Sequence, residues 1–430
     1  MELWGGHECT VSRVGDRWSD QSRLSGHDER PGDLDLFAEL GLKALRYPVV
    51  WERTERERGV YDWTWADERL GRMKALGVRP IVGLVHHGSG PAWTHLLDAG
   101  FAEGVARFAG QVAARYPWVE DWTPINEPLT TARFSALYGH WYPHLRDEAA
   151  FWRALLNQID AVRLSMKAIR AVNPAARLIQ TEDFGTTWGT PACREQAQFE
   201  NARRFMTWDL LTGRVDRDHP LWTRVAGFGL TDRLREIADD PCPPDVIGMN
   251  HYITSDRFLD HRLKRYPAHT HGGNGQIAYA DVEAVRVLED RPCGWDWNLK
   301  RLWLRYRLPV AITECHLGCT PEEQQRWLGQ AWEAAQEAGR AGVDVRALTV
   351  WSLLGAYDWD SLLTRMRSHY EPGAFDVSDG TPRPTPLAET IRHLARHGAP
   401  PPHPAEGWWN EPERLLYAPC QTAEMSEGRL

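Results

Sequence analysis

Two glutamates, each at the end of a strand-like run, are the strongest candidates for chemistry in this sequence. Glu127 lies in Trp-Thr-Pro-Ile-Asn-Glu-Pro (122–128), where a β-branched and aromatic run breaks at a proline. Glu314 directly follows the apolar run Leu-Pro-Val-Ala-Ile-Thr (308–313). A carboxyl group flanked by Trp122 and Ile125 is partly desolvated, which raises its pKa and suits it to donate a proton near neutral pH.

The two glutamates are far apart in sequence, so only the fold can bring them together. Taken alone, Asn126-Glu127-Pro128 is better explained as a solvated loop tip. A second glutamate at an equivalent strand end favours a catalytic pair. Two such carboxyl groups can hydrolyse a glycoside, because one protonates the leaving oxygen while the other attacks the sugar carbon or activates water.

An alternation of strand-like and helix-like segments predicts how the pair is positioned. The expected strands are 3–4, 43–50, 79–86, a fourth that leads into Glu127, 177–181, 245–249, 308–313 and 345–351. The expected helices are 33–42, 65–76, 101–116, 148–172, 199–211, 299–305, 322–338 and 385–395. Eight strands alternating with helices predict an α/β fold, a single (β/α)₈ TIM barrel whose active site lies at the C-terminal strand ends.

This pattern also predicts the domain organisation of the 430 residues. Residues 1–397 are expected to form one catalytic barrel, and residues 398–430 a proline-rich C-terminal extension. Two connections are unusually long, 129–147, which is rich in aromatic residues, and 261–275, which is polar and rich in glycine. We expect both to cover the site and the second to be mobile.

Composition excludes several classes of function. The formal net charge of −9 argues against a nucleic-acid partner, which needs a basic surface. The sequence has no apolar run of membrane-spanning length and no signal-like N-terminus, and its seven cysteines are scattered, so we expect a cytoplasmic protein without a disulfide framework. The 22 tryptophans offer flat apolar faces, and those at strand ends are candidates for stacking against a sugar.

The two glutamate motifs carry a family resemblance. Thr-Pro-Ile-Asn-Glu-Pro around Glu127 and Ile-Thr-Glu at Glu314 resemble the acid/base and nucleophile motifs of the family-1 glycoside hydrolases, the β-glucosidase type. The resemblance extends from Trp4 to about His397. It implies a retaining β-glycosidase that acts on a small carbohydrate, with no cofactor and no metal; the oligomeric state stays open.

The resemblance also implies substrate-binding roles for residues at other strand ends. These are Arg46 near the nucleophile, His86 and Asn126 on sugar hydroxyls, Asn250 with the nucleophile-holding Tyr252, Trp351 under the sugar, and Asp358 with Trp359 at its far edge.

Four positions depart from the family pattern, all in groups that contact the sugar or flank the nucleophile. No clear equivalent of the first-strand glutamine exists in residues 5–10, the expected tryptophan is His87, Phe-Glu-Trp is Tyr357-Asp358-Trp359, and Asn-Gly is Cys315-His316. The shortened carboxylate of Asp358 predicts a sugar altered on its far edge, and Arg365 and Arg367 are placed to serve an anionic one. A carbohydrate-binding or scaffold barrel without turnover, and a transglycosylase, are the alternative readings.

Overall fold

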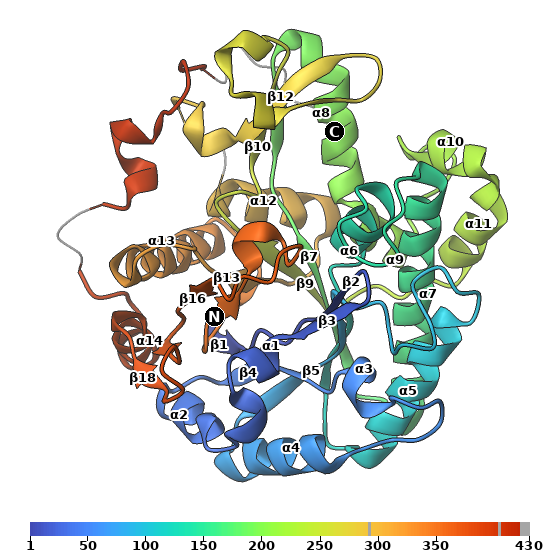
Figure 1. Ribbon diagram of the computed structural model, residues 1–430, viewed down its shortest axis with the longest axis vertical. Coiled ribbons are helices and arrows are strands. Elements are labelled where there is room, and N and C mark those ends of the chain that lie inside the picture. The colour runs from blue at the N-terminus through green and yellow to red at the C-terminus, as the bar shows by residue number, and fades with distance from the viewer. Residues whose placement is uncertain (291–293, 403–405, 422–430) are drawn as a thin grey trace.

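Eight parallel strands close into a barrel at the centre of the molecule (Figure 1). The computed structural model describes residues 1–290, 294–402 and 406–421. The barrel strands, in chain order, are β1 (Glu2–Gly6), β4 (Ala44–Pro48), β5 (Arg79–His86), β6 (Asp121–Asn126), β7 (Arg177–Asp183), β9 (Val246–His251), β13 (Val310–Cys315) and β14 (Val345–Val350). Neighbouring strands follow the chain, and β1 closes the ring by pairing with both β14 and β4. The predicted (β/α)₈ fold is confirmed.

Helices surround the strands because each presents one apolar face to the barrel. The longer ones are α2 (Asp33–Glu39), α4 (Thr64–Leu76), α5 (Phe101–Arg115), α7 (Glu148–Val172), α8 (Arg194–Arg204), α9 (Met206–Leu211), α11 (Thr231–Asp239), α12 (Trp295–Tyr306), α13 (Pro321–Arg340) and α14 (Pro386–His397). Short helices are α1 (Gln21–Leu24), α3 (Trp51–Thr54), α6 (Pro128–Ala132) and α10 (Trp222–Val225). In Figure 1, α2, α4, α5, α13 and α14 lie around the outside of the ring.

Strand register brings the predicted site residues to one end of the barrel. His86 of β5 pairs with Asn126 of β6, and Glu314 of β13 pairs with Asn250 of β9. Glu127 follows β6 directly. All five lie at the C-terminal ends of their strands, where barrel enzymes place their active sites.

The connection 261–275 carries regular structure, which the sequence did not predict. It lies between β10 (Arg257–Asp260) and β12 (Ala278–Glu283) and contributes β11 (His271–Gly273) to a four-stranded sheet with β8 (Thr187–Gly189). The sheet lies at the top of Figure 1, outside the barrel. Sequence pattern misses it because three-residue strands made of glycine and polar residues are specified by their partners.

The connection 129–147 is also structured. It comprises α6 and a π-helical turn, η2 (Arg133–Leu137), followed by an aromatic segment. The predicted helix at 199–211 is two helices, because the chain breaks at Phe205 between α8 and α9.

Small hairpins and single turns complete the C-terminal face of the barrel and the surface. The hairpin strands are β2 (Val11–Val14) with β3 (Arg17–Asp20), β15 (Ala356–Tyr357) with β16 (Tyr370–Glu371), and β17 (Phe375–Asp376) with β18 (Arg383–Pro384). The remaining turns are η1 (His27–Glu29), η3 (Pro191–Cys193), η4 (Ala226–Leu230), η5 (Leu263–Arg265), η6 (Ala268–Thr270), η7 (Ala284–Arg286), η8 (Trp359–Ser361), η9 (Trp408–Asn410) and η10 (Pro412–Arg414).

The described part of the C-terminal extension packs against the barrel. Trp409 is buried, with its ring 5.0 Å from that of Trp327 on α13. Cys420 pairs with Leu288 in an isolated bridge. The division at residue 397 remains a prediction. Within the described ranges, no helix is long and apolar enough to span a membrane.

Candidate active site

The candidate nucleophile Glu314 is buried and held from two sides. Arg46 Nη1 donates to Glu314 Oε1 at 2.7 Å, and the hydroxyl of Tyr252 donates to Oε2. Arg46 also donates to the Thr313 carbonyl and to Asn126 Oδ1, both at 2.7 Å. This arrangement fixes the carboxylate and satisfies the guanidinium inside the barrel, as a buried arginine requires.

The candidate acid Glu127 lies where β6 ends and α6 begins. Its backbone is left-handed, with φ 46°, and its amide donates to the Thr181 carbonyl of β7 at 3.2 Å. Asn250 Nδ2 donates to Glu127 Oε1 at 2.6 Å, and Thr313 donates to Asn250 Oδ1 at 2.7 Å. The amide of Asn250 is therefore oriented by the strand that carries Glu314.

Two neutral histidines contact Asn126, the residue before Glu127. Asn126 Nδ2 lies 3.3 Å from His86 Nε2 and 3.2 Å from His87 Nε2. Because the Asn126 amino group is a donor, both ring nitrogens accept, and His87 donates through Nδ1 to Thr131 Oγ1 at 3.0 Å. Burial lowers the pKa of His87 to about 3, which agrees with this tautomer. His87 Nε2 lies 3.6 Å from Glu127 Oε2 without forming an ion pair of charged groups.

Trp351 forms a flat wall of the site. His86 stacks on its ring, with centroids 5.3 Å apart and planes 5° from parallel. The Arg46 guanidinium lies 4.7 Å from the ring centroid. Gly6 at the end of β1 leaves room for the Trp351 ring, since a Cβ on residue 6 would lie 2.3 Å from an atom of that ring.

The electrostatic surroundings of the two glutamates differ, and they shift the two pKa values to different extents. Burial raises the pKa of Glu127 well above its usual value, and Glu314, Glu182 and Asp183 raise it further. Burial also raises the pKa of Glu314, but Arg46 and Tyr252 act in the opposite direction. Because Glu314 receives two strong donors, the proton resides on Glu127 and the negative charge on Glu314.

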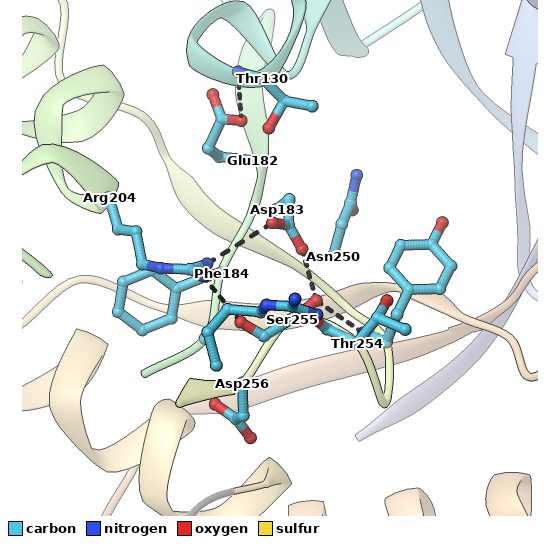
Figure 2. A network of polar contacts seen from close by, with 12 residues as sticks. Thr130, Glu182, Asp183, Phe184, Arg204, Asn250, Thr254, Ser255 and Asp256 are labelled. Atoms are coloured by element: carbon cyan, nitrogen blue, oxygen red, sulfur yellow. Dashed lines mark hydrogen bonds and ion pairs between the residues drawn. The ribbon is translucent and has the colours of Figure 1, made fainter. Parts of the chain in front are cut away.

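The end of β7 contributes two further carboxylates, which the sequence analysis did not single out. Glu182 is fully buried and accepts from the amides of Leu129 and Thr130 at 2.8 and 3.1 Å and from Thr207 Oγ1 at 2.7 Å. Figure 2 shows Glu182 below the amide of Thr130, so its carboxyl group caps the helix that follows Glu127.

Asp183 faces away from Glu182, toward a different set of partners (Figure 2). Ser255 donates to Asp183, and Arg204 Nη1 lies 3.5 Å from Asp183 Oδ2. Arg204 also donates to the Ser255 carbonyl at 2.8 Å. This network ties α8 to the loop after β9, where Ser255 Oγ accepts from the Tyr252 amide at 3.0 Å.

Asp358 turns toward its own loop. Asp358 Oδ1 accepts from the amides of Arg367 and His369 at 3.0 and 2.9 Å. Trp359 lies with its ring 5.5 Å from that of His87, and its Nε1 has no hydrogen-bond partner among the described residues. Trp141, from the connection 129–147, packs 5.2 Å from His87 and completes this wall.

Glu8 also reaches the site, although the sequence offered no equivalent of a sugar-binding group there. Its Oε1 accepts from the Thr10 amide at 2.9 Å, and its own amide donates to Ser352 Oγ at 3.1 Å. Burial raises the pKa of Glu8, and the charge of Glu314 raises it further.

Of the ten residues that the sequence singled out, nine are linked by the contacts described above, and the side chain of Asp358 turns toward its own loop. The structure adds Glu8, His87, Trp141 and Glu182 to the site. Glu182 carried a usable signal, since it is a carboxylate at the end of a buried strand, like Glu127 and Glu314. Glu8 and Trp141 lie in irregular segments whose placement depends on the whole barrel.

A closed eight-stranded parallel barrel with two buried, differently paired glutamates at its C-terminal strand ends is the arrangement of a barrel glycoside hydrolase. Residues 19–370 match glycosyl hydrolase family 1, and the chain belongs to this family. It is a glycoside hydrolase by this membership.

Curated relatives are distant but extend over most of the chain. Beta-glucosidase A of Thermotoga maritima is 22% identical over 396 residues, which cover 84% of each chain. The 6-phospho-beta-glucosidase of Dickeya chrysanthemi is 24% identical over 383 residues, 80% of this chain and 79% of the relative. A solved Thermotoga maritima beta-glucosidase in complex with deoxynojirimycin shares the fold, with TM-score 0.71 and 19% identity over 93% of this chain and 98% of that one.

Proposed function

We propose that this protein hydrolyses a β-linked glycoside with retention, by double displacement. Glu314 attacks the anomeric carbon, the glycosidic C–O bond breaks, and Glu127 transfers its proton to the leaving oxygen. Glu127, now ionised, removes a proton from water, and the water oxygen displaces Glu314 from the sugar carbon. Only after the second step are both glutamates back in their starting states, Glu127 protonated and Glu314 ionised.

The observation that supports this proposal is the unequal environment of the two carboxyl groups. Glu314 accepts from Arg46 and Tyr252, whereas Glu127 has one donor, Asn250, and several neighbouring carboxylates. An ionised nucleophile beside a protonated acid is the state in which a retaining glycosidase begins its reaction.

We further propose that the sugar is altered on its far edge. Asp358 Oδ1 is already engaged by two loop amides, so this side chain is committed to shaping the loop. Hydrogen bonds built for a substrate hydroxyl can be worth several orders of magnitude in selectivity, and their loss removes the preference for plain glucose or galactose. Measuring kcat/KM on a sugar panel for the wild type and Asp358→Glu tests this: the wild type should favour a deoxy, amino, acidic or phosphorylated sugar over plain glucosides by about a hundredfold. A wild type that already prefers plain glucosides would contradict the proposal of an altered sugar.

A panel of nitrophenyl β-glycosides tests the activity itself. Turnover of one or more sugars that disappears in Glu314→Gln supports the hydrolase. Sugar binding without turnover by the wild type would instead support a carbohydrate-binding barrel, and transfer of the glycosyl group to an added alcohol in preference to water would support a transglycosylase.

The cellular compartment is part of the same proposal. The six cysteines in the described ranges are all free thiols. Free thiols persist in a reducing environment, which supports a cytoplasmic location.

A further inference from the structure

A cavity of about 550 Å³ lies beside Asp358, is lined by none of the two glutamates' hydrogen-bond partners, and takes no part in the proposed hydrolysis. Its volume falls within the range of about 300–1,000 Å³ that small-molecule sites occupy. Its walls come from β2–β3, α1, α3 and the loop after β14, through Val11, Trp18, Ser19, Asp20, Arg23, Leu24, Glu52, Arg53, Arg56, Asp358, Met366 and Ser368.

The cavity adjoins residues that pack around the two glutamates. Asp358 lines it, and the next residue, Trp359, packs against His87. Glu52 also lines it and lies directly behind Gly88, where a Cβ would be 1.9 Å from Glu52 Oε1. His87 and Gly88 therefore separate the two spaces by one stretch of backbone.

The position of the cavity in the barrel decides which end of a substrate it can hold. Its walls follow β14, β1 and β4, three consecutive strands of the ring. The acid Glu127 follows β6, which lies outside this group of three strands in the barrel ring. Because the leaving group must lie beside the acid that protonates it, the cavity lies on the side of the retained sugar.

The lining suits a neutral, hydroxyl-rich group. Trp18 is 40% exposed and presents an apolar face of the kind that stacks on a sugar ring. Glu52 is 8% exposed, its Oε1 accepts from the Gly90 amide at 3.0 Å, and its Oε2 has no partner in the described part of the chain. Burial raises the pKa of Glu52 to about 7, so near neutral pH the group can donate to or accept from a hydroxyl.

Two of the three arginines in the lining are paired with carboxylates, and the third, Arg56, forms no ion pair among the described residues. Arg23 lies 3.6 Å from Asp20 and 3.5 Å from Asp28, and Arg53 pairs with the same two carboxylates. A phosphate or carboxylate would have to compete with these pairs, whereas a neutral saccharide leaves them intact.

We propose that this cavity is a subsite for a second saccharide unit, attached to the far edge of the sugar that Glu314 attacks. This inference rests on the proposed hydrolysis. It predicts that the natural substrate is a diglycoside and that the enzyme releases an intact disaccharide, breaking the bond between that disaccharide and the leaving group.

The first test compares nitrophenyl β-monoglycosides with nitrophenyl β-diglycosides, with chromatography of the products. We expect kcat/KM to be about tenfold or more higher for a diglycoside, with disaccharide as the first product. Trp18→Ala should lower the ratio of diglycoside to monoglycoside kcat/KM about tenfold, because it removes the stacking surface. Trp118→Ala, a half-buried tryptophan between α5 and β6 at the opposite end of the barrel, should leave the ratio unchanged.

The second test measures binding without turnover. Calorimetry of a diglycoside with Glu314→Gln, and with Glu314→Gln carrying Trp18→Ala, should show about tenfold weaker binding in the double variant. Equal diglycoside binding by the single and the double variant would contradict the proposed subsite. A wild type that prefers monoglycosides would contradict it as well. A preference for a phosphorylated or acidic monoglycoside also overturns it, in favour of an anion pocket. Turnover of no glycoside at all, with diglycoside binding retained and sensitive to Trp18, would contradict the proposed hydrolysis and leave the subsite standing.

Discussion

At the scale of single residues, the proposed catalysis depends on where one proton resides. Glu127 must be protonated to act as the acid, and its pKa is raised by burial and by neighbouring carboxylates. Activity should therefore be lost as pH rises through the pKa of Glu127. In Glu127→Gln, a substrate with a good leaving group should show no high-pH limb, while one with a poor leaving group should lose about 10²–10⁴-fold in kcat. A limb that persists in this variant would identify another group as the acid.

Glu182 provides a second prediction about the same proton. Burial raises the pKa of Glu182 to about 7, while its three partners, two amides and a hydroxyl, act in the opposite direction. The charge of Glu182 raises the pKa of Glu127, so Glu182→Gln should lower that pKa and move the high-pH limb toward lower pH.

A neutral residue that anchors the same helix is the control for Glu182. Gln158 Nε2 donates to the Pro128 carbonyl at 2.9 Å, so Gln158→Leu disturbs α6 without changing a charge. The Gln158→Leu substitution should leave the high-pH limb of the activity profile unchanged. Equal pH profiles for Glu182→Gln and the wild type would mean that Glu182 only supports the helix.

At the scale of elements, the close approach of β1 and β14 positions the wall of the site. A Cβ on Gly6 would overlap the ring of Trp351, whereas a Cβ on Gly71 in α4 meets no atom within 4 Å. Gly6→Ala should displace the indole and lower kcat/KM by about tenfold or more, because misplaced positioning groups reduce catalysis steeply. Gly71→Ala should keep full activity and stabilise the protein by about 1 kcal/mol. A Gly6→Ala enzyme with normal kinetics would show that Trp351 does not contact the sugar.

Most barrel strands were predictable because they are apolar runs between turn residues, several of them rich in β-branched residues, although β1 and β4 contain none. The helix predicted at 148–172 has the observed bounds, since it begins after a side-chain cap, Asp147 Oδ1 accepting from the Ala150 amide. The outer sheet with β11 was missed because its short strands depend on long-range pairing. Glu8 and Trp141 were missed for the same reason: their segments have no periodic pattern, and only the closed barrel brings them beside Glu314 and His87.

At the scale of the whole molecule, the C-terminal extension contributes to the core. Trp409 is 3% exposed and packs on Trp327, while Leu416 in the same segment is 63% exposed. Trp409→Ala should lower the free energy of unfolding by about 3–5 kcal/mol, and Leu416→Ala should change it by less than about 0.5 kcal/mol. Chemical denaturation measures both. Similar stabilities for the two variants would mean that the extension is only loosely attached.

In the proposed reaction, two buried glutamates in one barrel carry out a double displacement. The most direct measurement is proton NMR of the sugar first released from a nitrophenyl β-glycoside that the enzyme turns over. Two successive inversions at the anomeric carbon predict that the β-anomer appears first and the α-anomer only later, by mutarotation. Release of the α-anomer first would mean a single displacement by water, and would contradict the assignment of Glu314 as the nucleophile.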